Sequence, residues 1–111
     1  MTEKIPFKEW EKLEFVVGKI LNVESHPNAD KLYIMEVDLG DEKRKLVAGL
    51  KAHYTEKKLK GKHVIVFKNL EPAIIRGIKS EGMVLAAVNK DRSKVCLLEP
   101  DDDIELGSRV S

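Results

Sequence analysis

Short runs of apolar residues, rich in β-branched side chains, alternate with polar segments along the chain, which predicts a β-rich protein. The runs predict five strands and a shorter sixth at residues 14–24, 32–40, 44–50, 63–67, 83–88 and 94–100. The run at 63–67 is apolar at nearly every position, which is typical of a strand buried on both faces. Gly18 interrupts the first run, and we expect it to mark a bulge or a bend.

Two segments show helical spacing instead. Phe7, Trp10 and Leu13 follow Pro6 at intervals of three, so the opening of the chain predicts a short helix with one apolar stripe. Residues 52–62 also have helical spacing, and Gly61 is a plausible helix stop. The long connection at 68–82 contains one Pro and two Gly and is expected to be irregular.

Five short strands with a helix between the third and the fourth is the order of an OB-fold, a small all-β Greek-key barrel. The 111 residues suit a single domain, with a barrel core at about 14–89 and extra N- and C-terminal segments. OB-folds bind ligands on the face of strands two and three, between the loops after strands one and four. The polar connections 26–33 and 69–83 fall at those two places.

Charge is unevenly distributed along the chain. The totals of 20 Lys and Arg against 19 Asp and Glu indicate no particular partner. Residues 42–62 carry eight basic residues against two acidic ones, whereas residues 99–105 carry five acidic residues and no basic one. Such a dipolar distribution can steer a polyanion. A solvated helix followed by an acidic tail would show the same pattern.

Several functional classes have no support in the sequence. The charged N-terminus is unlike a signal peptide, and no apolar run approaches the roughly 20 residues of a membrane helix, so a cytoplasmic protein is expected. A phosphate-cradling Gly-rich loop is missing. Cys96 lies in an apolar strand and is expected to be buried and inert. His26, His53 and His63 lack metal-site spacing. We expect no catalysis, no metal and no cofactor.

Six motifs carry a resemblance to a known family. The segments VGKI, HPNADKLY, EVDLG, LVAGL, LKGKHVIVFKNLEP and RGIKSEGMVLAA occur in this order. Together they resemble the tRNA-binding domain family over residues 6–110. Its members include the C-terminal domain or β subunit of methionyl-tRNA synthetases and free-standing dimeric tRNA-binding proteins. Related secretion chaperones share the fold but lack HPNADKL and the RG..S.GM run, which places this chain on the tRNA-binding side.

The resemblance implies an OB-fold, tRNA as ligand, and a methionyl-tRNA synthetase catalytic subunit as a further partner. It also implies a homodimer built through the terminal segments. A barrel this small has little interior left for further apolar side chains. Two sets lie outside its five strands: the stripe of Phe7, Trp10 and Leu13, and the apolar residues of segment 95–110. Their alternative role is to close the ends of their own barrel. The opening Met favours a free-standing short protein, with a synthetase subunit or an excised domain as alternatives.

The resemblance places five side chains on the tRNA-facing side. Lys31 can meet a phosphate as a point charge, whereas the planar guanidinium of Arg76 can bind one with two hydrogen bonds. Ser80 can donate to a phosphate or a ribose 2′-hydroxyl, or it can stabilise a turn. Asn69 has the same two possibilities. Met83 can pack against a ribose or a base, or it can belong to the core.

The loop of residues 26–33 is interpreted as a rigid mount for Lys31. Asn28 and Asp30 can hydrogen-bond their own backbone and hold the loop in shape. His26 precedes Pro27, which restricts it to extended geometry. The imidazole could face RNA, and a role in positioning the loop is equally compatible.

Aromatic residues form only 5% of the chain, which argues against a surface that stacks successive bases. Recognition of tRNA through phosphates, 2′-hydroxyls and overall shape fits this composition better. Two other classes stay open. A chaperone-like peptide binder on the same barrel predicts an apolar binding face, and a protein-interaction module would only dock onto a synthetase.

Overall fold

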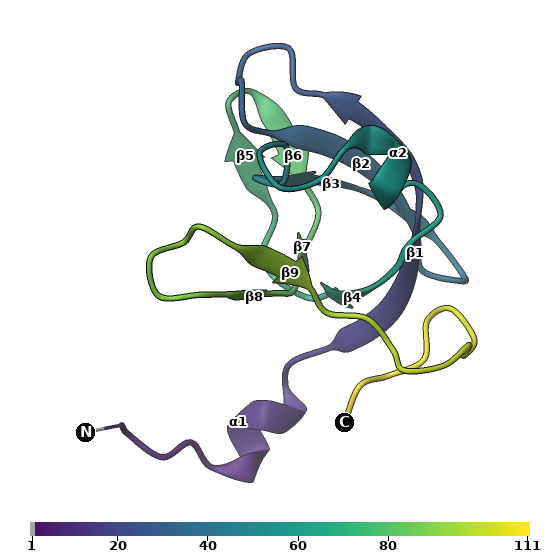
Figure 1. Cartoon of the computed structure of the whole chain (residues 1–111). Helices are drawn as coiled ribbons and strands as arrows, with labels where there is room; N and C mark the ends of the chain where they lie inside the picture. Colours follow the sequence, from purple (N-terminus) through teal and green to yellow (C-terminus); the bar gives the residue numbers. More distant parts are fainter. Residues whose placement is uncertain (1) are drawn as a thin grey trace.

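The computed structural model describes residues 2–111 and shows a five-stranded antiparallel sheet coiled into a nearly closed barrel (Figure 1). The strands are β1 (Phe15–Ser25), β2 (Tyr33–Asp38), β3 (Lys43–Ala48), β4 (His63–Phe67) and β7 (Met83–Val84). Their order in the sheet is β3-β2-β1-β4-β7, and β7 also contacts β3. This closure is that of an OB-fold, so the predicted fold class is confirmed.

Short elements complete the described part of the chain. Strand β5 (Ala73–Ile75) pairs with β6 (Ile78–Ser80), and β8 (Ala86–Val88) pairs with β9 (Val95–Leu97). The connection 68–82, which we expected to be irregular, therefore contains a hairpin. The strand predicted at 83–88 is divided at Leu85, because β7 pairs with β4 whereas β8 pairs with β9. No helix in residues 2–111 is long and apolar enough to cross a bilayer.

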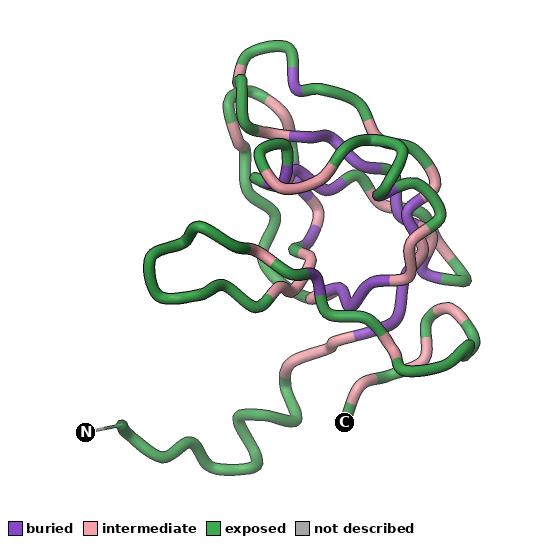
Figure 2. The backbone as a smooth tube through the Cα atoms, in the orientation of Figure 1, coloured by how far each residue is buried: buried purple, intermediate pink, exposed green. Residues whose placement is uncertain are grey.

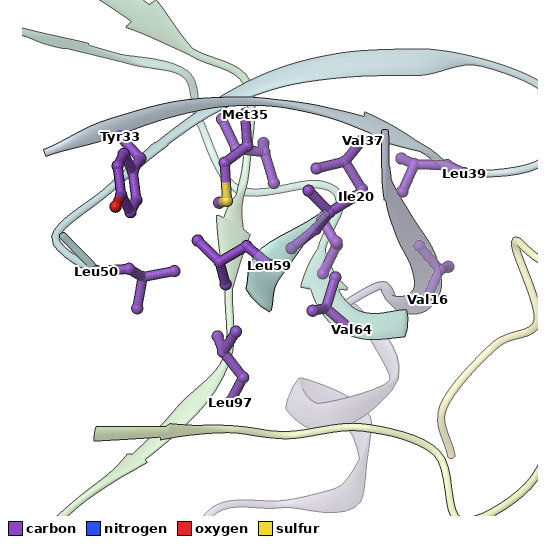
Figure 3. Packing of buried hydrophobic residues seen from close by; sticks show 12 residues of the cluster. Val16, Ile20, Tyr33, Met35, Val37, Leu39, Leu50, Leu59, Val64 and Leu97 are labelled. Atoms are coloured by element: carbon purple, nitrogen blue, oxygen red, sulfur yellow. The ribbon is translucent and has the colours of Figure 1, made fainter. Parts of the chain in front are cut away.

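Alternating side chains fill the barrel interior. Tyr33, Met35 and Val37 of β2 are buried, whereas Glu36 between them is exposed. Figure 3 shows Met35 close to Leu59, which the short helix α2 (Glu56–Leu59) inserts into the core. The central residues of β4 are buried as predicted. Leu97 of β9 belongs to the same buried cluster.

The helix predicted over residues 52–62 is shorter than expected. The amides of His53 and Tyr54 both donate to the carbonyl of Leu50 at 2.9 Å and form a turn rather than a helix. Thr55 has extended backbone, and its hydroxyl accepts from the amide of Lys58 at 3.2 Å. This N-cap therefore fixes the start of α2 after residues 52–54.

Gly18 was expected to mark a bulge or a bend, but the bulge lies elsewhere in β1, and Gly18 serves a close approach. The register of β1 against β2 shifts between Ile20 and Asn22, so the irregularity lies at Leu21. A Cβ at position 18 would lie 2.8 Å from Cγ1 of Val37 and 2.9 Å from Cδ2 of Leu39. Both neighbours are buried side chains, so a methyl group at position 18 would force them to shift.

The two terminal segments meet beside the first half of β1 (Figure 1). The amide of Val17 donates to Ser108 at 3.0 Å, and the amide of Val110 donates to Phe15 at 2.8 Å. The helix α1 (Phe7–Glu11) ends close by, where the Arg109 guanidinium donates to the carbonyls of Glu11 and Leu13. The C-terminal segment therefore extends the barrel and also caps α1.

The apolar stripe of α1 is covered only in part. The Trp10 ring stacks on Phe15 with centroids 5.4 Å apart, and Leu13 is half-buried. Phe7, however, is 70% exposed and Ile5 is 73% exposed. Figure 2 shows this opening segment as an exposed arm that extends from the barrel. Part of the stripe thus covers its own barrel, and part faces outward.

The close approach at Gly18 leads to a first prediction. Gly18→Ala should lower the free energy of unfolding by about 1–3 kcal/mol, because the new methyl group overpacks a buried contact. Gly49→Ala is the matched control, since the nearest atom to its Cβ would be Leu32 Cδ2 at 3.8 Å. Chemical denaturation of the two variants measures the difference. Equal stabilities would contradict the packing argument.

Candidate nucleic-acid interface

The two loops predicted to form the site lie together at one end of the barrel (Figure 1). Nε2 of His26 lies 3.1 Å from the carbonyl oxygen of Ile75, so a side chain of the first loop contacts the β5–β6 hairpin. A depression of about 360 Å³ between them is lined by Arg76 and residues 29–32. Lys31 and Arg76, which are 45 positions apart in sequence (76 minus 31), therefore share one depression.

Arg76 occupies a strained position at the tip of this hairpin. Ile75 pairs with Ile78, which leaves Arg76 and Gly77 as a two-residue turn with φ angles of 52° and 89°. Two positive φ angles define a type I′ turn, where Asn or Gly is usual at the first position. An arginine in left-handed conformation costs about 1–2 kcal/mol. Arg92, which is also exposed, has the same left-handed conformation with φ of 61°, so what distinguishes Arg76 is its place beside Lys31.

Lys31 is exposed at the rim of the same depression. The amide of Lys51 donates to the carbonyl of Lys31 at 3.4 Å. This contact brings part of the basic run, residues 42–62, next to the loop. Lys31, Lys51 and Arg76 are all exposed. This end of the barrel thus combines three cations from three different connections.

Ser80 is buried, and its hydroxyl takes part in the fold. The oxygen accepts from the amide of Val47 at 3.0 Å, and the hydroxyl donates to the carbonyl of Gly82 at 3.1 Å. The amide of Glu81 donates to Lys45 at 2.9 Å beside it. These contacts join the hairpin to β3 and correspond to the turn-stabilising role that the sequence left open for this serine.

Asn69 and Met83 lie on other parts of the surface. The side-chain oxygen of Asn69 accepts from the amide of Glu14 at 2.8 Å, and its nitrogen donates to the carbonyl of Lys12 at 2.7 Å. Asn69 thereby fixes the junction of α1 and β1 to the end of β4. Met83 is 46% exposed at the start of β7 and opposite Phe67, so its side chain does not belong to the buried core.

The outer surface of β1, β2 and β3 forms a groove of about 520 Å³. It carries charges of both signs, because Glu24 and Glu36 face outward together with Lys43 and Lys45. Asn22 donates to the carboxylate of Glu36 at 2.9 Å. Our sequence reading missed these carboxylates. The alternation along residues 33–38 was the available signal, since it places Glu36 on the face opposite the core.

The basic run is divided by internal ion pairs. Arg44 donates to the Glu42 carboxylate at 2.7 Å and also to the carbonyls of Lys68 and Glu81, so its guanidinium is used within the barrel. This hydrogen bond from Arg44, together with the nearby charges of Arg44 and Lys68, lowers the pKa of Glu42. Lys62 pairs with Glu99 of the acidic segment at 3.2 Å. The run is therefore not one continuous cationic surface.

Cys96 is exposed, so the expectation that it is buried was wrong. Side chains alternate along β9, and the inward position belongs to Leu97. Cys96 instead points outward opposite Ala87, which is also exposed. Within residues 2–111, no three His, Cys, Asp or Glu side chains come together in a group that could hold a metal ion.

OB-fold barrels bind oligonucleotides or oligosaccharides on this face, and cationic residues on the two flanking loops fit a polyanionic ligand. The family comparison is more specific. Residues 15–109 match the family described as putative tRNA binding domain, and the chain belongs to this family.

Relatives of known sequence or structure agree with this assignment. The chain is 51% identical over 108 residues to the methionine–tRNA ligase of Thermococcus kodakarensis, covering 97% of the chain and 14% of the ligase. The structure of the MetRS-related protein of Pyrococcus horikoshii superposes with a TM-score of 0.93 at 31% identity, covering 99% of this chain and all of that protein. The CsaA chaperone protein of Picrophilus torridus superposes with a TM-score of 0.88 at 29% identity, covering 97% of this chain and 100% of that one.

The hydrogen bonds of Ser80 lead to a second prediction. Ser80→Ala should lower the free energy of unfolding by about 1–3 kcal/mol, because two buried backbone groups would lose their partner. Ser93→Ala removes an exposed hydroxyl that bonds to Asp91, and should change stability by no more than about 0.5 kcal/mol. Thermal or chemical unfolding compares the two. A Ser80→Ala variant as stable as wild type would contradict the role assigned here.

Proposed function

We propose that this chain binds tRNA without catalysis, through phosphates and shape, and assists a methionyl-tRNA synthetase in cis or in trans in the cytoplasm. Arg76 is the observation that carries the proposal, since a strained, exposed guanidinium lies beside Lys31 at the ligand end of an OB-fold. Membership of the tRNA-binding domain family supports tRNA as the ligand. The methionine–tRNA ligases among its relatives support the choice of synthetase.

The five expected site residues take different parts in this proposal. Arg76 binds a phosphate through its two-pronged guanidinium, Lys31 adds a point charge, and Met83 offers an exposed apolar contact to a ribose or base. Ser80 supports the hairpin that bears Arg76, because its hydroxyl bonds to the backbone of Val47 and Gly82. Asn69 instead bonds to the backbone of Lys12 and Glu14, so it holds the α1–β1 junction and not the Arg76 loop.

The positions of the aromatic residues favour RNA binding through phosphates over binding through base stacking. Tyr33 is buried, and the rings of Phe15 and Phe67 pack against each other with centroids 4.8 Å apart. The exposed aromatic residues Phe7 and Trp10 lie on α1, away from the two cationic loops (Figure 1). Stacking of successive bases needs exposed aromatic platforms. Glu24 and Glu36 in the groove would repel phosphates, so the RNA backbone is expected to run over the cationic loops at its end.

A peptide-binding role is the alternative suggested by the similarity to the CsaA chaperone structure. Such a role calls for an apolar binding face. The groove on β1, β2 and β3 instead carries Glu24, Glu36, Lys43 and Lys45. This charged groove does not offer the apolar face that peptide binding calls for, so binding of tRNA over the cationic loops is the better supported function.

The third prediction tests the proposed function. Wild-type protein should bind several unmodified tRNAs alike, with log K falling by about 0.7–0.9 per log unit of salt for each phosphate contacted. Arg76→Asn should weaken binding by about 1.5–3 kcal/mol and reduce that slope by about one phosphate. Asn is chosen because it tolerates the left-handed turn, so the hairpin should keep its shape.

Lys57→Ala is the control, since Lys57 is an exposed cation on α2. Fluorescence anisotropy at several salt concentrations between about 50 and 200 mM measures the tRNA affinity and the salt slope of all three proteins. An equal-length RNA duplex serves as competitor. Salt-insensitive binding, or equal losses in the two variants, would overturn the assignment. Binding of peptide but not of tRNA would favour the chaperone-like alternative.

We also propose a homodimer in which the exposed arm of Ile5 and Phe7 packs against a second copy. The arm leaves large apolar side chains outside the barrel, and Leu98 and Ile104 of the C-terminal segment are exposed as well. A two-fold axis would make such a surface self-complementary. Two cationic ends in one particle would also let a single tRNA gain from both.

The fourth prediction concerns this dimer. Phe7→Glu should give a folded monomer, because it places a charge in the proposed apolar interface. Ile74→Glu is the matched control, since Ile74 is also 70% exposed but lies on β5. Sedimentation velocity at micromolar concentration distinguishes monomer from dimer. A monomeric wild type, or a Phe7→Glu variant that stays dimeric, would refute the proposed interface.

A further inference from the structure

Two polar side chains are buried within residues 2–111, and both hold the β5–β6 hairpin. Ser80 is 3% exposed and joins the base of the hairpin to β3. His26 is 4% exposed and contacts the hairpin next to its tip. A hairpin of two three-residue strands is marginal by itself, so its position depends on such anchors.

The hydrogen bonds of His26 define its tautomer. Nδ1 lies 3.0 Å from the amide nitrogen of Asn28, and this N–H can only donate, so Nδ1 is the unprotonated acceptor. In the neutral ring the proton is then on Nε2, which donates to the carbonyl of Ile75 at 3.1 Å. One bond closes the loop that bears Lys31, and the other reaches across to the hairpin that bears Arg76.

The cross-loop bond acts at the position where it can orient the site. Ile75 is the last residue of β5 and directly precedes Arg76. The carbonyl that His26 holds belongs to the peptide unit joining Ile75 to Arg76, and it thereby fixes the entry into the strained turn. The ring and Lys31 belong to the same loop, so this bond ties the segment that bears Lys31 to the hairpin that bears Arg76.

We infer that His26 is a positioning residue for RNA binding, which sets the Arg76 guanidinium relative to Lys31 through its Nε2–H bond to Ile75. This inference rests on the proposed function and deepens it. Two cations held at a fixed separation can contact two phosphates without the loss of loop entropy that free loops would suffer on binding. His26 itself is buried and does not touch the RNA.

Two substitutions separate the two bonds of the ring. The Asn oxygen in His26→Asn can replace Nδ1 and accept from Asn28, but the shorter side chain cannot reach Ile75. The amide nitrogen of Gln in His26→Gln can replace Nε2 and donate to Ile75, while the bond to Asn28 is lost. His26→Asn should therefore lower tRNA affinity roughly five- to tenfold, whereas His26→Gln should stay within about twofold of wild type.

A double-mutant cycle distinguishes positioning from general destabilisation. In an Arg76→Asn background, His26→Asn should lower tRNA affinity by less than about twofold, because the group that it positions is gone. Equal tRNA affinity of His26→Asn and His26→Gln, or full additivity with Arg76→Asn, would overturn the inference. If Arg76→Asn binds tRNA like wild type, the proposed site itself is wrong, which is a different outcome.

Nitrogen NMR on the wild-type protein gives a test that needs no variant. The neutral His26 ring should show a slowly exchanging Nε2 proton and an unprotonated Nδ1, both free and with tRNA bound. A ring protonated on Nδ1, or an Nε2 proton in fast exchange with water, would refute the proposed anchor.

Discussion

The barrel closes at a seam between β3 and β7, and this closure depends on side chains. Strand β7 has only two residues, so it cannot form a long backbone ladder with β3. Arg44 fills part of the gap by donating to the carbonyls of Lys68 and Glu81. Ser80 fills another part by joining Val47 to Gly82. Open edges of a sheet leave unpaired backbone groups, and these two side chains satisfy some of them here.

The same seam positions the candidate interface. The β5–β6 hairpin leaves the barrel where Ser80 anchors it, and His26 holds the hairpin again beside its tip. The strained Arg76 turn is thus supported from both sides, which is the condition under which a costly backbone conformation persists. The position of the hairpin therefore depends on the same side-chain bonds that help to close the barrel.

The basic residues of the run at 42–62 are adjacent in sequence, but tertiary contacts leave only some of them available to a ligand. Arg44 pairs with Glu42 at the seam, and Lys62 pairs with Glu99 of the acidic segment. Lys43, Lys45 and Lys51 remain exposed. The groove on β1, β2 and β3 adds two carboxylates to its lysines. The electrostatic contrast between groove and loops, more than the total charge, favours an RNA path over the loops.

Local patterns of the sequence determined most strands and the buried character of residues 63–67, because apolar alternation is a property of neighbouring residues. The order of the strands, which matches an OB-fold, determined that the two loops lie together. Only the tertiary structure decided that Ser80 and His26 serve the fold, that Cys96 faces outward and that Gly18 permits a close crossing. Ser80 bonds to Val47, which is 33 positions away, and His26 bonds to Ile75, which is 49 positions away. A hydroxyl or an imidazole has the same chemistry in a loop and in a core, so its role depends on which distant backbone group the closed barrel brings to it.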